Sequence, residues 1–174
     1  REDEKIKKVV EEVRKKLEDV DKNSRDAIED DKRVNKEVDR NSERAFKENE
    51  DEIRKVKEAG VDEKKLKESR DNSKRVLDRS KELLKRSEEN TRRLAKESKE
   101  LLKEVRDRLE DLRRRVKNAD EVVKELERIV AEVEKLSREV VKRLKENVKR
   151  VRDLSKRVVE YLKEDADRLK EDVR

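Results

Sequence analysis

The chain has 174 residues, of which 60 % are charged and 29 % are apolar. On composition alone, such a low apolar fraction is typical of disordered chains. Its 55 basic and 49 acidic residues are interleaved and leave a net charge of +6, which favours a solvated salt-bridge surface over a polyanion-binding one. The absence of Cys and His excludes disulfides, thiolate ligands and histidine chemistry.

Two short stretches carry the only turn signals, and they divide the chain into three predicted helices. Gly60 suits the left-handed residue that ends a helix, and Asp62 suits the N-cap of the next helix. In the second turn, Asn118 is the candidate left-handed residue and Asp120 the following N-cap. The predicted helices cover about 3–58, 62–117 and 120–174, with loops at about 59–61 and 118–119. Loops this short make each helix fold back antiparallel on the previous one.

Apolar residues recur every three or four positions in all three predicted helices. In the third helix the stripe runs from Val122 to Val173 with about 3.64 residues per step, and the other two give about 3.57. Both values lie near 3.6, the period of a straight helix. Outward positions hold mostly charged residues, with many opposite charges four residues apart. The predicted fold class is all-α: a single antiparallel up-down-up three-helix bundle over residues 1–174, with long, nearly straight helices.

The inward stripe of the middle helix is unusually polar, because more than half of its core-facing positions from Ser69 to Ser98 are Ser or Asn. Folding at Gly60 places residue n of the first helix beside about residue 120 − n of the second. Folding at 118–119 places residue n of the second helix beside about residue 237 − n of the third. The polar positions then fall into four predicted layers: Ser24 with Ser98 and Ser137; Asp31 with Ser87, Asn90 and Asn147; Asn41 and Ser42 with Ser80 and Ser155; and Asn49 with Asn72, Ser73 and Asp165.

Between the polar layers the same pairing predicts apolar ones, such as Ile28 with Leu94 and Leu144. A buried polar group without a partner costs about 1–3 kcal/mol, so a dozen of them would cancel the stability of a typical domain. We therefore expect the Ser, Asn and Asp side chains to pair across helices and to set register and topology. The alternative is that they lie on partly wetted rims and only keep the chain soluble.

The residues do not form a recognisable active site. Asp31 and Asp165 could hold a hard cation together with Asn90 and Asn147. One carboxylate per layer is a poor ligand set, however, so no metal or other cofactor is expected. The inward serines have no evident base beside them, and a straight three-helix core is expected to leave no cavity. We therefore expect the protein not to be an enzyme.

Nucleic-acid and membrane partners are not expected either. Arg113–Arg115 with Lys117, and the basic residues around 142–150, are the clusters that phosphates could use. The two aromatic side chains look like core, which leaves no stacking platform for specific recognition. The longest apolar run, Ile129–Ala131, is too short for a membrane span or a signal peptide. We expect a soluble chain whose compartment the sequence leaves open.

The loops 59–62 and 117–120, the Ser/Asn layers and repetitive surfaces such as SKELLKR at 80–86 occur together across the whole chain. In this combination the chain resembles computationally designed (de novo) helical bundles with buried hydrogen-bond networks. The resemblance implies a stable scaffold without biological activity, or one half of a designed heterodimer or switch. A spectrin-like repeat is also a three-helix bundle, but that family characteristically carries a core Trp, which this chain lacks.

Two hypotheses for the function follow. In the first, the chain is a self-contained structural scaffold that needs no partner and is a monomer. In the second, it is an interaction module, one chain of a designed hetero- or homo-oligomer or switch, and its polar stripe completes networks with another helix. The two hypotheses differ in whether the polar positions satisfy one another within one chain.

Overall fold

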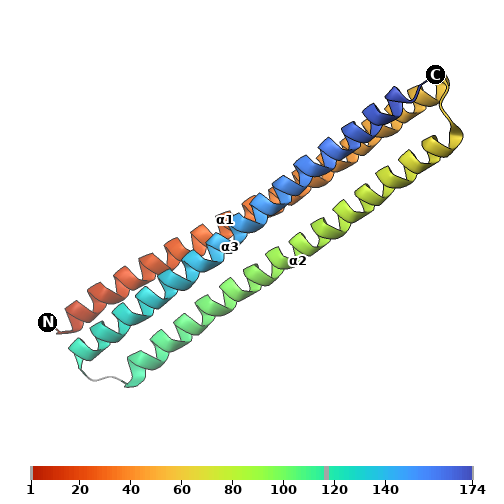
Figure 1. Cartoon of the computed structure of the whole chain (residues 1–174). Coiled ribbons are helices and arrows are strands. Elements are labelled where there is room, and N and C mark those ends of the chain that lie inside the picture. Colours follow the sequence, from red (N-terminus) through yellow and green to blue (C-terminus); the bar gives the residue numbers. More distant parts are fainter. Residues whose placement is uncertain (1, 116–117, 174) are drawn as a thin grey trace. The chain divides into compact units, whose positions relative to one another are not determined.

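The computed structural model describes residues 2–115 and 118–173, which form three α-helices (Figure 1). α1 spans Glu2–Ala59, α2 spans Glu63–Arg115 and α3 spans Ala119–Glu171. Hydrogen bonds join α1 to α2, α2 to α3 and α1 to α3. The predicted all-α three-helix bundle is therefore confirmed.

The bundle divides into two compact units, and each contains a segment of all three helices. Unit 1 consists of the chain up to Asp31 and of Thr91–Glu146, as far as these segments are described. Unit 2 consists of Lys32–Asn90 and of the chain from Asn147 onward. Each unit has its own core and its own polar contacts. That residues 1–174 form one domain stays a prediction.

The register of α1 against α2 follows from two side-chain contacts inside unit 2. Ser80 bonds to Ser42, and Ser87 bonds to Asn35. Residue n of α1 therefore lies opposite about residue 122 − n of α2, and the two helices run antiparallel. The predicted pairing, 120 − n, was two residues off, because the turn is centred one residue after Gly60.

Side-chain contacts also define the register of α3 against α2 and α1. Within unit 2, α2 and α3 are antiparallel, because Ser69 bonds to Asp165 while Ser87 bonds to Asn147. Asn49 of α1 bonds to the backbone of Leu162 of α3, 113 residues further along the chain. Within unit 1, Val20 packs with Leu102 and Val133. Val20 and Leu102 fit 122 − n, whereas Leu102 and Val133, like Leu84 and Val151 in unit 2, fit about 235 − n and not the predicted 237 − n. The up-down-up order of the helices is thus present in each unit.

Apolar side chains form a core in each unit. In unit 1 the most buried are Leu126, Ile129 and Leu144. Leu144 packs with Leu94 and Ile28, as the apolar layer predicted. In unit 2, Val34, Val38, Leu84 and Val151 form one cluster, and Ile53, Val56, Leu66 and Leu169 form another. Burying a side chain of this size stabilises a fold by about 1.5–3 kcal/mol.

Near its N-terminus, α1 buries a different face from the one the sequence suggested. The predicted stripe ran from Ile6 through Val10 to Val13. In the structure Val10 is 38 % exposed, and Val9 packs on the cluster that contains Val13 and Leu126. Both neighbours fit a helical spacing of three or four residues, so the sequence pattern could not distinguish them.

The first turn has the predicted chemistry. Gly60 follows the end of α1 with a φ of 94°, and its N–H donates to the carbonyl of Lys57. Asp62 caps α2, because its side chain accepts from the N–H of Lys64 at 3.3 Å. Val61 packs on the cluster that contains Leu66, which fixes the angle at which the chain enters α2.

The second turn differs from the prediction. Asn118, not Asp120, caps α3. The Oδ1 atom of Asn118 accepts a hydrogen bond from the N–H of Asp120 at 3.1 Å, and the carbonyl oxygen of Asn118 accepts one from the N–H of Val122. Asn118 is not left-handed, since no described residue other than glycine has a positive φ. The helix consequently starts at Ala119, which is buried. Asn is as good an N-cap as Asp, so the two candidates were close in energy.

The predicted helix ends at 117 and 174 lie outside the described residues. Before position 174, α3 already ends at Glu171, and the N–H groups of Asp172 and Val173 donate to carbonyls three residues earlier. Such tighter bonds commonly close the last turn of a helix.

Gly60→Ala is expected to lower the free energy of unfolding by about 1–2 kcal/mol, because an L side chain is strained in the left-handed region. No atom lies within 4 Å of a Cβ at this position, so the cost should come from the backbone alone. Urea unfolding would measure it. Gly60→Asn should lose less, because Asn tolerates this conformation. An alanine variant as stable as the parent would contradict this account of the turn.

Candidate functional site

A single hydroxyl group joins all three helices of unit 2. Ser87 of α2 donates to Asn35 Oδ1 of α1 at 2.8 Å and accepts from Asn147 Nδ2 of α3 at 3.0 Å. The same Asn147 nitrogen also lies 3.5 Å from the carbonyl oxygen of Ser87. All three side chains are buried. Of these residues, the sequence placed Ser87 and Asn147 in one layer.

A second polar contact in unit 2 is built around Asp165 of α3. Its Oδ2 accepts from the hydroxyls of Ser69, at 2.6 Å, and Ser73, at 3.1 Å, both on α2. The three residues are at most 7 % exposed. Hydrogen bonds to a carboxylate are stronger than those between neutral groups, so this is expected to be the strongest polar contact between α2 and α3.

The other buried polar side chains of unit 2 form hydrogen bonds between two helices at most. Ser80 and Ser42 bond to each other at 3.3 Å. Ser155 is buried too, but in the described part of the chain no side-chain hydrogen bond joins it to Ser80. Asn49 donates to the carbonyl of Leu162 at 2.8 Å. Its expected partners were Asn72 and Ser73.

Unit 1 contains two further polar groups. Ser24, Ser98 and Ser137 are all buried, but among the described residues no hydrogen bond links them to one another. Asp31 is completely buried, at 0 % exposed, and has an interaction partner. The observed register places it opposite Thr91, which is buried and likewise has an interaction partner.

Three of the predicted layer residues are not core residues. Asn41 is exposed, so its assignment to the layer of Ser42 was wrong. Asn72 and Asn90 are only half-buried, and Asn90 keeps an interaction of its own. The remaining twelve predicted positions are buried: Ser24, Asp31, Ser42, Asn49, Ser73, Ser80, Ser87, Ser98, Ser137, Asn147, Ser155 and Asp165.

Sequence reasoning left Asn35, Ser69 and Thr91 out of the layers, and all three are buried. Asn35 and Thr91 each lie next to a position that was assigned to the stripe, and a helix in a three-helix bundle buries more than one line of residues. The register error mattered as well. Pairing by 122 − n places Asn35 opposite Ser87, whereas pairing by 120 − n placed Ser87 between Asp31 and Asn35. A turn centred on Val61 was the signal that could have identified Asn35 and Thr91, whereas Ser69 pairs with Asp165 of α3 and depends on the other register.

Two buried amide atoms have no hydrogen-bond partner among the described residues. They are Nδ2 of Asn35 and Oδ1 of Asn49. Each belongs to a side chain whose other amide atom is bonded. An unpaired buried polar atom costs about 1–3 kcal/mol, so the polar groups of unit 2 are only partly compensated.

On the surface, ion pairs connect neighbouring helices. In unit 2, Lys170 of α3 lies 2.8 Å from Glu52 of α1. This contact lowers the pKa of Glu52 and raises the pKa of Lys170. In unit 1, Arg108 of α2 lies 3.0 Å from Glu132 of α3. Exposed pairs of this kind contribute little to stability because water and salt screen them.

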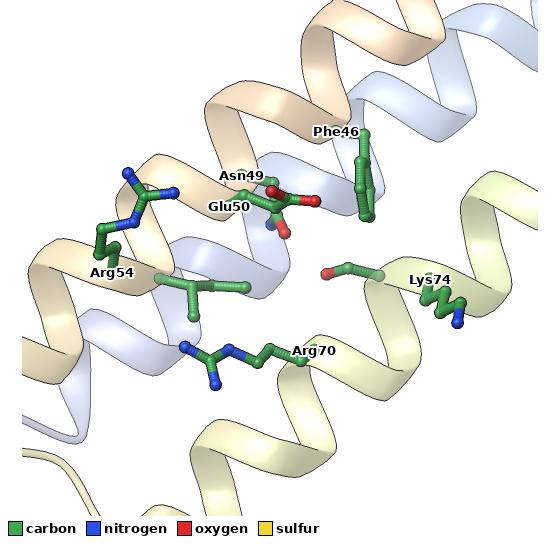
Figure 2. A pocket seen from close by; sticks show the side chains of 8 residues that line it. Phe46, Asn49, Glu50, Arg54, Arg70 and Lys74 are labelled. Carbon is green, nitrogen blue, oxygen red and sulfur yellow. The ribbon is translucent and has the colours of Figure 1, made fainter.

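A cavity of about 360 Å³ lies between α1 and α2 in unit 2 (Figure 2). Phe46 and Ile53 form its apolar walls, Asn49 and Ser73 contribute polar atoms, and charged residues surround them. The cavity is open to solvent, because the charged residues that line it are exposed. It therefore does not test the expectation that the core itself leaves no cavity, which stays a prediction.

The described members of the two basic clusters that phosphates could use are on the surface. Of the cluster Arg113–Arg115 with Lys117, only Arg114 has a described side chain, and it pairs with Glu110 at 3.3 Å. Lys117 lies outside the described residues. The basic residues around 142–150 are exposed. Both aromatic side chains, expected in the core, are only half-buried.

Within the described residues, no three acidic side chains are grouped in a way that could hold a metal ion. No described helix has a stretch long and apolar enough to cross a membrane. Comparison of the chain with protein families, with curated proteins and with solved structures gave no match.

Replacing Ser69 and Ser73 together by Ala is expected to cost about 2–4 kcal/mol of unfolding free energy, because Asp165 stays buried without its two donors. The matched control is Ser42→Ala with Ser80→Ala, which removes a neutral pair and should cost about 1 kcal/mol or less. Both double variants gain similar helix propensity, so that effect cancels in urea unfolding curves. Equal losses would show that the carboxylate contact is no stronger than the hydroxyl pair.

Proposed function

We propose that this chain is a de novo designed structural scaffold with no natural biochemical activity, in which layers of buried Ser, Asn and Asp set register and topology. The observation that carries the proposal is the contact of Ser87 with Asn35 and Asn147, which links one residue from each helix. The glycine and N-cap chemistry of the loops and the repetitive charged surface support it further.

Alternative packings, in which one helix has slid along another, differ more in their polar contacts than in their apolar ones. Apolar contacts are non-directional, so a helix that slides by one turn, about 5.4 Å, exchanges one aliphatic neighbour for another at little cost. The same slide separates Ser87 from both amides. Each buried polar group that loses its partner costs about 1–3 kcal/mol, so the native register is favoured over its neighbours.

A second candidate function is supported by a different observation. The amide atoms Asn35 Nδ2 and Asn49 Oδ1 have no hydrogen-bond partner among the described residues. Both atoms are buried inside the bundle, so in an interaction module a helix of another chain would reach them by taking the place of one of the three helices. The chain would then be one part of a designed oligomer or switch.

The register hypothesis is tested by replacing Asn35 and Asn147 by Leu and Ser87 by Ala in one variant. We expect the variant to be about as stable as the parent, because the three side chains of the contact are removed together and none of them stays buried without the other two. It should nevertheless populate more than one packing, seen as additional or broadened amide resonances in two-dimensional NMR spectra. Asn41→Ala, at an exposed position of the same helix, is the control. A single sharp set of resonances from the triple variant would refute a role in specificity.

The two candidate functions predict different masses in solution. A self-contained scaffold should give one species near 21.0 kDa at two protein concentrations, measured by light scattering on a sizing column. A dimer or larger species that grows with concentration would instead support the interaction module. The measurement needs no substitution, so it does not depend on how well a variant folds.

A further inference from the structure

The cavity between α1 and α2 of unit 2 has a size and a lining that the scaffold function does not use. Its volume, about 360 Å³, is within the range of small-molecule sites in proteins. Phe46 and Ile53 of α1 supply apolar surface, and the Phe46 side chain is only half-buried. An aromatic body of similar width could therefore pack against Phe46 in an offset or edge-to-face geometry.

The charges around the cavity are unbalanced. Three cationic side chains line it, Arg54 from α1 and Arg70 and Lys74 from α2, against the single carboxylate of Glu50. In the described part of the chain, Arg70 and Lys74 take part in no salt bridge. Arg54 lies 3.6 Å from Asp51, but both side chains are well exposed, so the pair is weak. The cationic groups thus remain available to an anion.

The positions of the guanidinium groups of Arg54 and Arg70 indicate how an anionic ligand would be oriented in the cavity. Figure 2 shows Arg54 of α1 and Arg70 of α2 toward one end of the cavity, on its two sides, and Phe46 and Lys74 toward the other end. Guanidinium groups match the planar oxygen pairs of carboxylates and related anions and can bond to them through two N–H groups. A ligand with an aromatic ring at one end and an anionic group at the other would match both ends.

We propose that this cavity binds a small aromatic anion, an aryl sulfonate or aryl carboxylate, with its ring against Phe46 and Ile53 and its anionic group between Arg54 and Arg70. Asn49, which is 3 % exposed, lines the cavity next to Ile53. Its amide nitrogen already donates a hydrogen bond to the carbonyl oxygen of Leu162. The site belongs to the folded chain and needs no second subunit.

The probe for the test is 8-anilinonaphthalene-1-sulfonate, an aromatic sulfonate whose fluorescence rises in apolar surroundings. Titration of the full chain at about 0.15 M salt, where exposed charges are screened beyond about 8 Å, should give a saturable rise with one site per chain. Amide NMR shifts should concentrate at residues 46–54 and 70–74. The variant Arg54→Gln with Arg70→Gln should bind about tenfold more weakly, because two charged hydrogen-bond donors are lost.

The matched control is Arg40→Gln with Arg79→Gln, which removes the same charge from exposed positions on α1 and α2 outside the cavity. Its affinity should stay within about twofold of the parent, because distant exposed charges are screened. These four positions are at the surface, so helix content by circular dichroism should not change. An unsaturable signal, an equal loss in both double variants, or NMR shifts away from the cavity would each overturn the proposal.

Discussion

The hydroxyl of Ser87 is held between an amide of α1 and an amide of α3, and it joins all three helices of unit 2 through directional hydrogen bonds. Its two hydrogen bonds, 2.8 Å and 3.0 Å, tolerate a shift of only a few tenths of an ångström. Aliphatic packing has no such tolerance limit, since one leucine can replace another along a helix. The proposed role in register rests on this difference: the surface is repetitive and the aliphatic stripes are short, so directional polar contacts would distinguish one packing from the next.

The two units differ in the hydrogen bonds that their buried polar side chains form. Unit 1 has three apolar clusters, and its serine layer is buried without hydrogen bonds between the serines in the described part of the chain. Unit 2 has two apolar clusters and the directional bonds of Ser87 and Asp165. Both units bury apolar side chains, and among the described residues unit 2 adds hydrogen bonds between buried polar side chains of different helices. The cost of that arrangement is visible in unit 2 as two amide atoms without a partner among the described residues.

The positions that could be predicted from the sequence are those that few residue types can occupy. The left-handed Gly60 and the N-cap Asp62 were predictable, because few residue types satisfy those positions. Asn118 and Asp120 were not distinguishable, because both are good N-caps. Ser73 and Asp165 were predicted to share a layer and are bonded. The third residue of the Ser87 contact was missed because Asn35 lies next to Val34, which was assigned to the inward stripe, and because the predicted register placed Ser87 between Asp31 and Asn35.

By itself, the sequence determined the helices, their number and their antiparallel order, because helix periodicity and turn chemistry are local and depend on residue spacing alone. It also determined that many core positions would be polar. Only the tertiary structure decided which hydroxyl meets which amide, which of two adjacent residues such as Val9 and Val10 turns inward, and where a cavity remains. These outcomes depend on helix rotation and register to within one residue, and that precision arises only when three helices pack against one another.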